Sequence, residues 1–168
     1  LSAALAGVFA VVHLAARVHV MHDKAFDPLQ EFRRVNLAGT AALAQAAAAQ
    51  GVRRFVFVST AKVNGDSTSA TPFTEEDPPD PQDPYAVSKW EAEEALRSIA
   101  VKSGLEIVIV RPPLVYGPGV RANFLHLLRL VALGVPLPLP DAANRRSLIG
   151  VENLADFLVQ CVGNDGAA

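Results

Sequence analysis

Tyr85 and Lys89, preceded in the chain by Ser59-Thr60, are the residues whose types and spacing best suit chemistry. A tyrosine and a lysine four residues apart share one face of a helix. The lysine ammonium favours the phenolate and lowers the pKa of the phenol from its usual value of about 10. A hydroxyl from Thr60 would hold a substrate oxygen beside that phenol. This trio suits proton transfer to or from an alcohol or carbonyl while a nicotinamide exchanges a hydride.

The Tyr-x-x-x-Lys spacing alone is not specific. It occurs in many helices, where the lysine simply lays its aliphatic stem along an exposed face. A motif of this kind becomes informative only when its structural context agrees with it. The elements that position the two residues therefore decide the interpretation.

The composition describes a globular protein. The chain has 168 residues, of which 51% are hydrophobic and 19% charged, enough for one domain with a core. No apolar run reaches about 18 uninterrupted residues, so no membrane span is predicted. The net charge of -2 and the scattered basic pairs do not predict nucleic-acid binding. The single cysteine, Cys161, is predicted to be a small buried hydrophobe, and the absence of a signal-peptide pattern favours the cytoplasm.

Apolar runs alternate with helix signals along the chain. Asp83-Pro84 is a typical helix start, with Asp as the N-cap and Pro in the first helical position. This alternation predicts an α/β fold with a parallel sheet covered by helices on both faces. The predicted strands are 8–15, 55–58, 105–110 and 147–149; the predicted helices are 36–50, 84–102, 123–133 and 151–162; residues 61–83 form a long loop and 135–140 an extended piece.

The candidate residues fall where the predicted strands end. Ala15-Ala16, Ser59-Thr60 and Pro112-Pro113 each follow an apolar run. Ligands of open parallel sheets bind outside the carboxyl ends of the strands. We therefore expect these three segments to border one shared site.

Taken together, six blocks in this order resemble the extended short-chain dehydrogenases/reductases, specifically the NAD-dependent sugar-nucleotide epimerase/dehydratase family. The resemblance implies a Rossmann-like, doubly wound parallel sheet. The blocks are His13-Leu14-Ala15-Ala16, Asn36-Leu37-Ala38-Gly39-Thr40, the run from Phe55 to Gly65, Tyr85 to Lys89, Arg111 to Gly119, and Arg146 to Leu154.

The resemblance implies a role for each matching residue. Tyr85 would be the acid/base, Lys89 would lower its pKa and bond the nicotinamide ribose, and Thr60 would bond the sugar hydroxyl that is oxidised. The cofactor would be NAD or NADP, and the substrate a nucleotide-diphosphate sugar. Ala15, Ala16, Asn36, Ser59, Tyr85, Lys89, Pro112 and Pro113 would border the cofactor, while Thr60, Asn123 and Arg146 would contact the substrate.

Several of these residues have simpler explanations. Asn36 and Asn123 could be helix caps, because Asn caps helices well. Arg146 could be a solvated surface arginine, and its neighbour Arg145 could equally take the phosphate-binding role. His19, His22 and Asp23 suggest a metal, but no further cluster with ligand spacing supports a metal site, and none is predicted.

The resemblance also predicts what lies outside this stretch. In the family a Gly-x-x-Gly-x-x-Gly loop holds the cofactor pyrophosphate, and it would precede Leu1. Residues 1–120 would then be the C-terminal part of a dinucleotide-binding domain, and 121–168 the start of a substrate-binding portion packed on the same unit. We expect this partial fold to lack full activity alone, with its first strand forming an uncovered edge.

One departure from the family discriminates between reactions. Family dehydratases carry Asp-Glu after the active-site threonine, since eliminating water needs extra acid/base groups. This chain has Ala61-Lys62 there, so dehydration is not predicted. Asn64 stands where a tyrosine is commoner, and Leu114 stands where some epimerases have a polar residue. The identity of the sugar is therefore not predicted.

The resulting prediction is a 4-epimerase of a nucleotide-diphosphate sugar. The nearest alternative is an NADPH-dependent reductase of a 4-keto sugar nucleotide that uses the same residues once. The segment from Arg111 to Gly117 also resembles steroid and flavonoid ketone reductases, although Arg146 favours a diphosphate. A third alternative is a non-catalytic binding or oligomerisation module, and the helices 36–50 and 84–102 could pair in a homodimer.

Overall fold

A three-stranded parallel sheet forms the centre of the fold. The computed structural model describes residues 1–18, 25–68, 71–120, 122–134 and 145–167. Strands β1 (Ala10–His13), β2 (Arg54–Val58) and β3 (Glu106–Val110) lie in the order β1-β2-β3. The register pairs Val12 with Val56 and Val56 with Val108. The three predicted strands are confirmed, and β1 is shorter than the predicted run 8–15.

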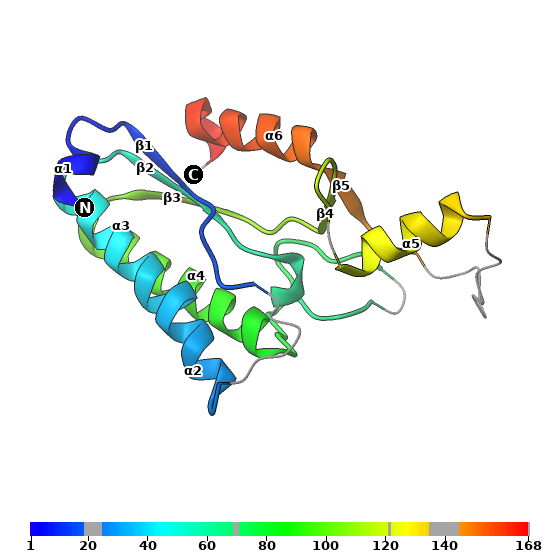
Figure 1. The fold of residues 1–168 in the computed structure, drawn as a ribbon. Helices are drawn as coiled ribbons and strands as arrows, with labels where there is room; N and C mark the ends of the chain where they lie inside the picture. Colours follow the sequence, from blue (N-terminus) through cyan, green and yellow to red (C-terminus); the bar gives the residue numbers. More distant parts are fainter. Residues whose placement is uncertain (19–24, 69–70, 121, 135–144, 168) are drawn as a thin grey trace.

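Helices cover both faces of this sheet (Figure 1). Helices α2 (Pro28–Phe32), α3 (Thr40–Ala49) and α4 (Pro84–Ser103) lie on one face, and α6 (Val151–Gly163) lies on the other. Side chains alternate along a strand. Phe55 and Phe57 therefore pack against α3 and α4, whereas Val56 joins the cluster under α6. The doubly wound α/β architecture predicted from the sequence is confirmed.

The first long helical run begins earlier than predicted. It starts at Pro28 rather than at Asn36 and continues through a π-helical stretch, Arg33–Gly39, into α3. The Asp27 carboxylate accepts a hydrogen bond from the Gln30 amide at 3.2 Å. Asp27-Pro28 is thus the same start signal as the one read at Asp83-Pro84, which caps α4 as predicted.

The remainder of the chain forms a smaller parallel pair and its helices. Strand β4 (Leu114–Tyr116) pairs with β5 (Leu148–Gly150), followed directly by α6. The strand at β5 was predicted and β4 was not, because Pro112-Pro113 indicated only the end of β3. Helix α5 (Ala122–Ala132) projects away from the central sheet (Figure 1). Short helical turns at Ser2–Leu5 (α1), Ala61–Val63 and Asp165–Ala167 complete the described elements.

Helix α6 is anchored to the central sheet by a buried arginine. Arg54 of β2 has 2% of its side chain exposed and donates to the backbone oxygens of Cys161 at 3.0 Å and Asn164 at 2.6 Å. It also donates to the Val162 oxygen at 3.2 Å and makes two bonds to Glu106 of β3. Cys161 is buried, as predicted, and burial raises the pKa of its thiol.

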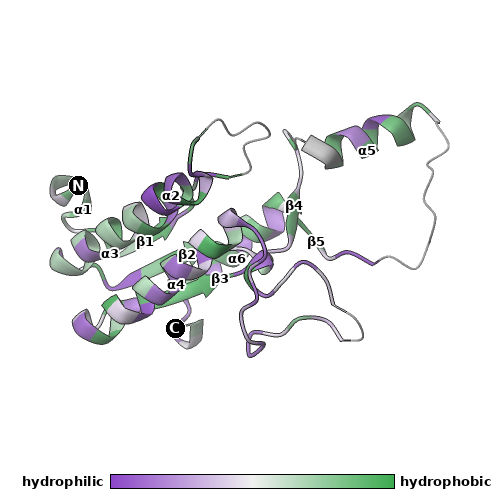
Figure 2. Ribbon diagram, turned by 90° about the horizontal axis from the view of Figure 1, so that it is seen from below, coloured by the Kyte–Doolittle hydropathy of each residue, from purple (hydrophilic) through white to green (hydrophobic). Residues whose placement is uncertain are grey.

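The hydropathy colouring summarises this arrangement: β2 and β3 are largely hydrophobic and lie between helices of mixed character (Figure 2). No helix in the described ranges is long and apolar enough to cross a membrane. The predicted domain boundary at residue 120 stays a prediction, as does the role of residues 121–168. The predicted extended piece 135–140 falls outside the described residues.

Candidate active site

The carboxyl ends of β2 and β3 are held together beyond their last residues. The Ser59 amide donates to the Val110 oxygen at 2.7 Å, and the Ala61 amide donates to the Pro112 oxygen at 3.0 Å. Thr60 lies between these two bonds and caps the following turn, with its hydroxyl accepting from the Lys62 amide at 3.3 Å. The backbone of Thr60 is therefore fixed on both sides.

Tyr85 stands opposite this strand end, in the first turn of α4. Its ring is half-buried against Phe32 at a centroid distance of 6.2 Å. Burial raises the pKa of the Tyr85 phenol, as does the nearby charge of Asp83, and a side-chain hydrogen bond with Thr60 works in the opposite direction. The structure thus brings together Thr60 and Tyr85, the two predicted hydroxyl groups.

Lys89 lies one helical turn further along α4 and is buried, with 1% exposed. Its ammonium donates to the Val58 backbone oxygen at 2.7 Å and lies 3.8 Å from the centroid of the Phe57 ring. Burial lowers the pKa of Lys89 from its usual 10.5 to about 8, while the negative charge of Glu93 raises it.

The predicted lowering of the Tyr85 pKa by Lys89 is not seen in this structure and stays a prediction. The pKa of Tyr85 is raised rather than lowered, and Lys89 is not among the causes. The physical reason is that Lys89 directs its ammonium to Val58 and Phe57, at the end of β2, while desolvation dominates at Tyr85. The residues share a helix face, as predicted, but their electrostatic coupling does not follow from that spacing.

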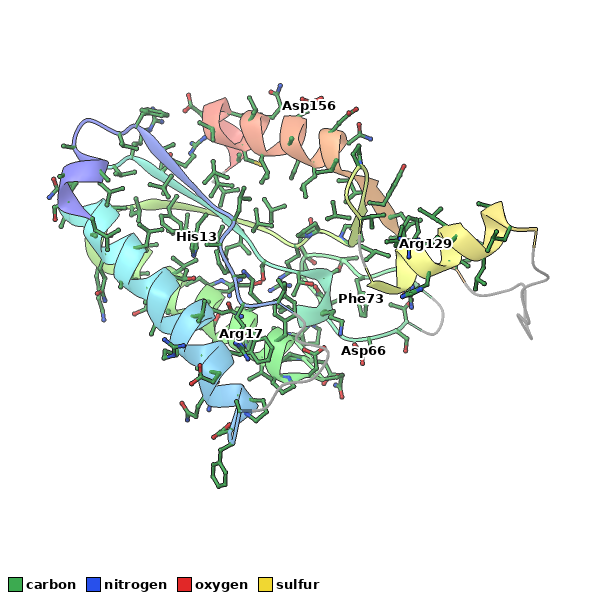
Figure 3. All side chains as sticks on the ribbon, in the orientation of Figure 1. His13, Arg17, Asp66, Phe73, Arg129 and Asp156 are labelled. Carbon is green, nitrogen blue, oxygen red and sulfur yellow. The ribbon has the colours of Figure 1, made fainter. Side chains whose placement is uncertain are left out.

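Asn36 is placed by the π-helical stretch, a feature that often occurs at functional sites. Its side chain is 1% exposed and is already bonded within the protein. The amide accepts from the Arg17 backbone N–H at 2.8 Å and donates to the Arg17 oxygen at 3.0 Å and to the Ser88 hydroxyl at 2.9 Å. It is not a helix cap. It holds the segment after β1, which includes Ala15 and Ala16, against α4; His13 and Arg17 mark the two ends of that segment in Figure 3.

The remaining predicted cofactor residues line the same sheet end. Ala15 is exposed and Ala16 half-buried, directly after β1, and Pro112 and Pro113 are half-buried after β3. Small side chains at the first strand end leave room for a flat ligand against the backbone, and the hydroxyl and ammonium groups nearby suit ribose and sugar hydroxyls. These residues fit a dinucleotide. The predicted cofactor contacts themselves stay predictions, and the Ser59 hydroxyl donates to Glu93 inside the protein.

The predicted substrate residues are described less fully. Arg146 is exposed two residues before β5. Asn123 is part of α5, and its predicted contact with substrate, like that of Arg146, stays a prediction. His19, His22 and Asp23 fall outside the described residues. Within the described ranges there is no group of three or more His, Cys, Asp or Glu side chains that could hold a metal ion.

Sequence reasoning missed two ion pairs beside the site. Lys62 pairs with Asp83, the N-cap of the Tyr85 helix. Glu93, fully buried on α4, binds Arg111 through both carboxylate oxygens. The available signal for Glu93 was its position, four residues after Lys89 and eight after Tyr85, which places all three on one helical face.

Comparison with known proteins identifies the family. The sequence model of the NAD dependent epimerase/dehydratase family matches residues 1–167, and the chain belongs to this family. The chain is 51% identical over 160 residues to UDP-glucose 4-epimerase from Vibrio cholerae, a match that covers 94% of the chain and 49% of that relative. The chain therefore spans about half the length of this relative.

Solved structures agree with the fold. The dTDP-glucose 4,6-dehydratase from Streptomyces venezuelae with NAD bound superposes with a TM-score of 0.79 at 32% identity, over 96% of this chain and 50% of the other. The UDP-glucuronic acid 4-epimerase from Bacillus cereus in complex with NAD gives a TM-score of 0.81 at 25% identity, over 99% of this chain and 53% of the other. Both superpositions support the Rossmann-like α/β fold that the sequence indicated.

Proposed function

We propose that the protein containing this chain is an NAD(P)-dependent 4-epimerase of a nucleotide-diphosphate sugar. The observation that carries the proposal is the meeting of Thr60, Tyr85 and Lys89 at the carboxyl ends of parallel strands. The Tyr85 phenol lies beside the Thr60 hydroxyl, which acts to lower the phenol's pKa, and the Lys89 ammonium lies at the end of the same strand. Identity of 51% to UDP-glucose 4-epimerase supports the choice of reaction.

Each residue has a defined task in this proposal. Thr60 holds the C4 hydroxyl of the sugar beside Tyr85, and Tyr85 accepts the hydroxyl proton as the alcohol becomes a ketone. Lys89 supplies a nearby positive charge and binds the ribose of the cofactor. NAD(P), when bound, supplies a hydride acceptor and donor. Once the other face of the 4-keto sugar has been reduced, Tyr85 returns the proton to the new hydroxyl.

Lys62 supports epimerisation over dehydration. Loss of water from the sugar needs acid/base groups in addition to Tyr85. At the second position after Thr60 the chain has Lys62, which is engaged with Asp83. This position therefore offers a bound cation rather than a carboxylic acid, and the neighbouring Ala61 has no titratable group.

The proposal is tested by turnover of the full-length gene product and its Tyr85→Phe variant. With UDP-glucose and UDP-N-acetylglucosamine as probes, NMR should show the C4 epimer forming without net change in the reduced cofactor. Tyr85→Phe removes the acid/base and should lower kcat by about 10²- to 10⁴-fold. Tyr116→Phe, the same change at the other tyrosine of the chain, is the matched control and should leave kcat near the wild-type value.

The alternatives give different results in the same assay. A reductase would consume NADPH in proportion to a 4-keto sugar nucleotide and would form no epimer. A binding or oligomerisation module would show no turnover and would keep its ligand affinity in Tyr85→Phe. A cytoplasmic location, a homodimer and the lack of nucleic-acid binding remain parts of the proposal, to be checked by fractionation, light scattering and a nucleic-acid binding assay.

A further inference from the structure

A fully buried carboxylate, Glu93, joins the three segments that carry the candidate site. Glu93 lies on α4 and is 0% exposed. The Ser59 hydroxyl, at the end of β2, donates to Oε1 at 2.5 Å. Arg111, at the end of β3, donates to Oε1 at 3.0 Å and to Oε2 at 2.6 Å. One side chain therefore ties the tyrosine helix to two strand ends.

Arg111 and Glu93 each make a further polar contact. The Arg111 guanidinium also donates to the Asn64 side-chain oxygen at 3.2 Å, which holds the loop after Thr60. Arg97 reaches Glu93 from α4 at 3.3 Å and is 46% exposed. Arg111 is 16% exposed. The ion pair with Arg111 is therefore the protected one, and a bidentate pair fixes geometry as well as charge.

Glu93 is also the negative charge that faces Lys89. The two residues are four apart on α4, and Glu93 favours the charged form of Lys89 against the effect of burial. His13, from β1, is also coupled to Lys89; burial and the lysine charge lower the pKa of His13. Because His13 is favoured in its neutral form, Glu93 supplies the opposite charge that Lys89 requires.

We propose that Glu93 is the positioning residue of this site: its carboxylate fixes Ser59 and Arg111, and thereby Thr60 and Pro112, around the Tyr85–Lys89 face of α4. The inference rests on the proposed function for its catalytic consequence. It adds a role that the Tyr85, Lys89 and Thr60 triad does not contain. The arrangement holds two strand ends and one helix in register before any ligand arrives.

The test compares two bidentate Arg–Glu pairs on the same helix. Glu93→Gln removes the charge beneath the site. Glu91→Gln removes the carboxylate that Arg33 binds between the π-helical stretch and α4, and serves as the matched control. Both are made in the full-length gene product. The readouts are the pH profile of kcat and, independently of turnover, the pH dependence of the unfolding free energy.

The expected direction follows from linkage. Between its folded pKa of about 8 and its usual 10.5, Lys89 binds fewer protons in the folded state, so stability rises with pH in that window. Without Glu93 the folded pKa of Lys89 falls further. In Glu93→Gln the rise in stability should begin at least about 1 pH unit lower, and the alkaline limb of kcat should move the same way. Glu91→Gln should move neither.

A second variant covers the case in which Glu93→Gln does not fold, since it leaves Arg111 buried without its counter-charge. Glu93→Asp keeps the charge but withdraws it from Ser59. It should retain the wild-type pH dependence of stability and lower kcat by about 10- to 100-fold. An unchanged kcat in Glu93→Asp would overturn the positioning role, as would a Glu93→Gln protein that matches Glu91→Gln in both readouts. A shifted stability profile with no wild-type turnover would support the Glu93–Lys89 coupling and overturn the proposed function alone.

Discussion

The two parallel sheets among the described residues differ in how completely helices cover them. In the central sheet Phe55, Val56 and Phe57 are 0% exposed, because α3 and α4 pack on one face and α6 on the other. In the β4–β5 pair, Leu114 and Leu148 are 41% and 45% exposed. The residues with chemistry stand at the end of the covered sheet.

The comparison shows what burial contributes to a site. At the end of the covered sheet, three candidate residues have partners within the protein: Val58 and Phe57 for Lys89, Thr60 for Tyr85, and Arg17 for Asn36. Arg146, next to the open pair, is exposed. The geometry of Thr60, Tyr85 and Lys89 is thus built into the core, whereas Arg146 stands beside a pair of strands with little packing of its own.

The largest expected effect separates two neighbouring arginines of β2. Arg54→Met should lower the unfolding free energy by about 3–5 kcal/mol, because Glu106 and the last carbonyls of α6 lose a buried partner. Arg53→Met is the control: its side chain is 50% exposed, and its bonds to Glu106 and Asp165 lie in solvent. Urea unfolding of both variants measures the difference. Equal losses would contradict the idea that Arg54 anchors α6.

An effect of intermediate size should appear in the pH dependence of stability. The depression of the Lys89 pKa from 10.5 to about 8 corresponds to as much as about 3 kcal/mol. Since the folded pKa is the lower one, the cost of the buried charge is fully present below pH 8 and is relieved as the pH rises towards 10. Lys89→Met should lack this rise. Denaturant unfolding at several pH values compares the two proteins, and parallel curves would contradict a lowered pKa of Lys89.

The sequence was sufficient for the elements of the covered sheet. Strands with continuous apolar runs and a helix with an Asp-Pro start are strong local signals, and β2, β3 and α4 follow them closely. The same Asp-Pro signal occurs at Asp27, and the helix begins at Pro28 rather than at the predicted residue 36. Strand β4 is only three residues long and follows two prolines. It pairs with β5, which is distant in the sequence, so no local sequence pattern predicts it.

The sequence predicted which residues lie near the strand ends but not the electrostatics around them. The identities of Thr60, Tyr85 and Lys89 came from spacing and resemblance. The direction of the Tyr85 pKa depends on burial and on where the Lys89 ammonium points, and spacing contains neither. The burial of Glu93 also could not be predicted from the sequence, since an acidic residue in a helix is usually exposed. Glu93 is buried because Arg111 and Ser59, at the ends of two strands, pack against its carboxylate and bond to it.

The smallest expected effect lies in helix α5, away from the covered sheet. Leu128 is 46% exposed, whereas Leu96 of α4 is 0% exposed in the cluster with Phe55 and Phe57. Leu96→Ala leaves a cavity and should cost about 2–5 kcal/mol, but Leu128→Ala should change the unfolding free energy by less than about 0.5 kcal/mol. Urea unfolding of the full-length gene product measures both. A loss of more than about 1 kcal/mol in Leu128→Ala would mean that α5 is packed in the full-length gene product. The contrast between the two sheets would then hold only for the described residues of this chain.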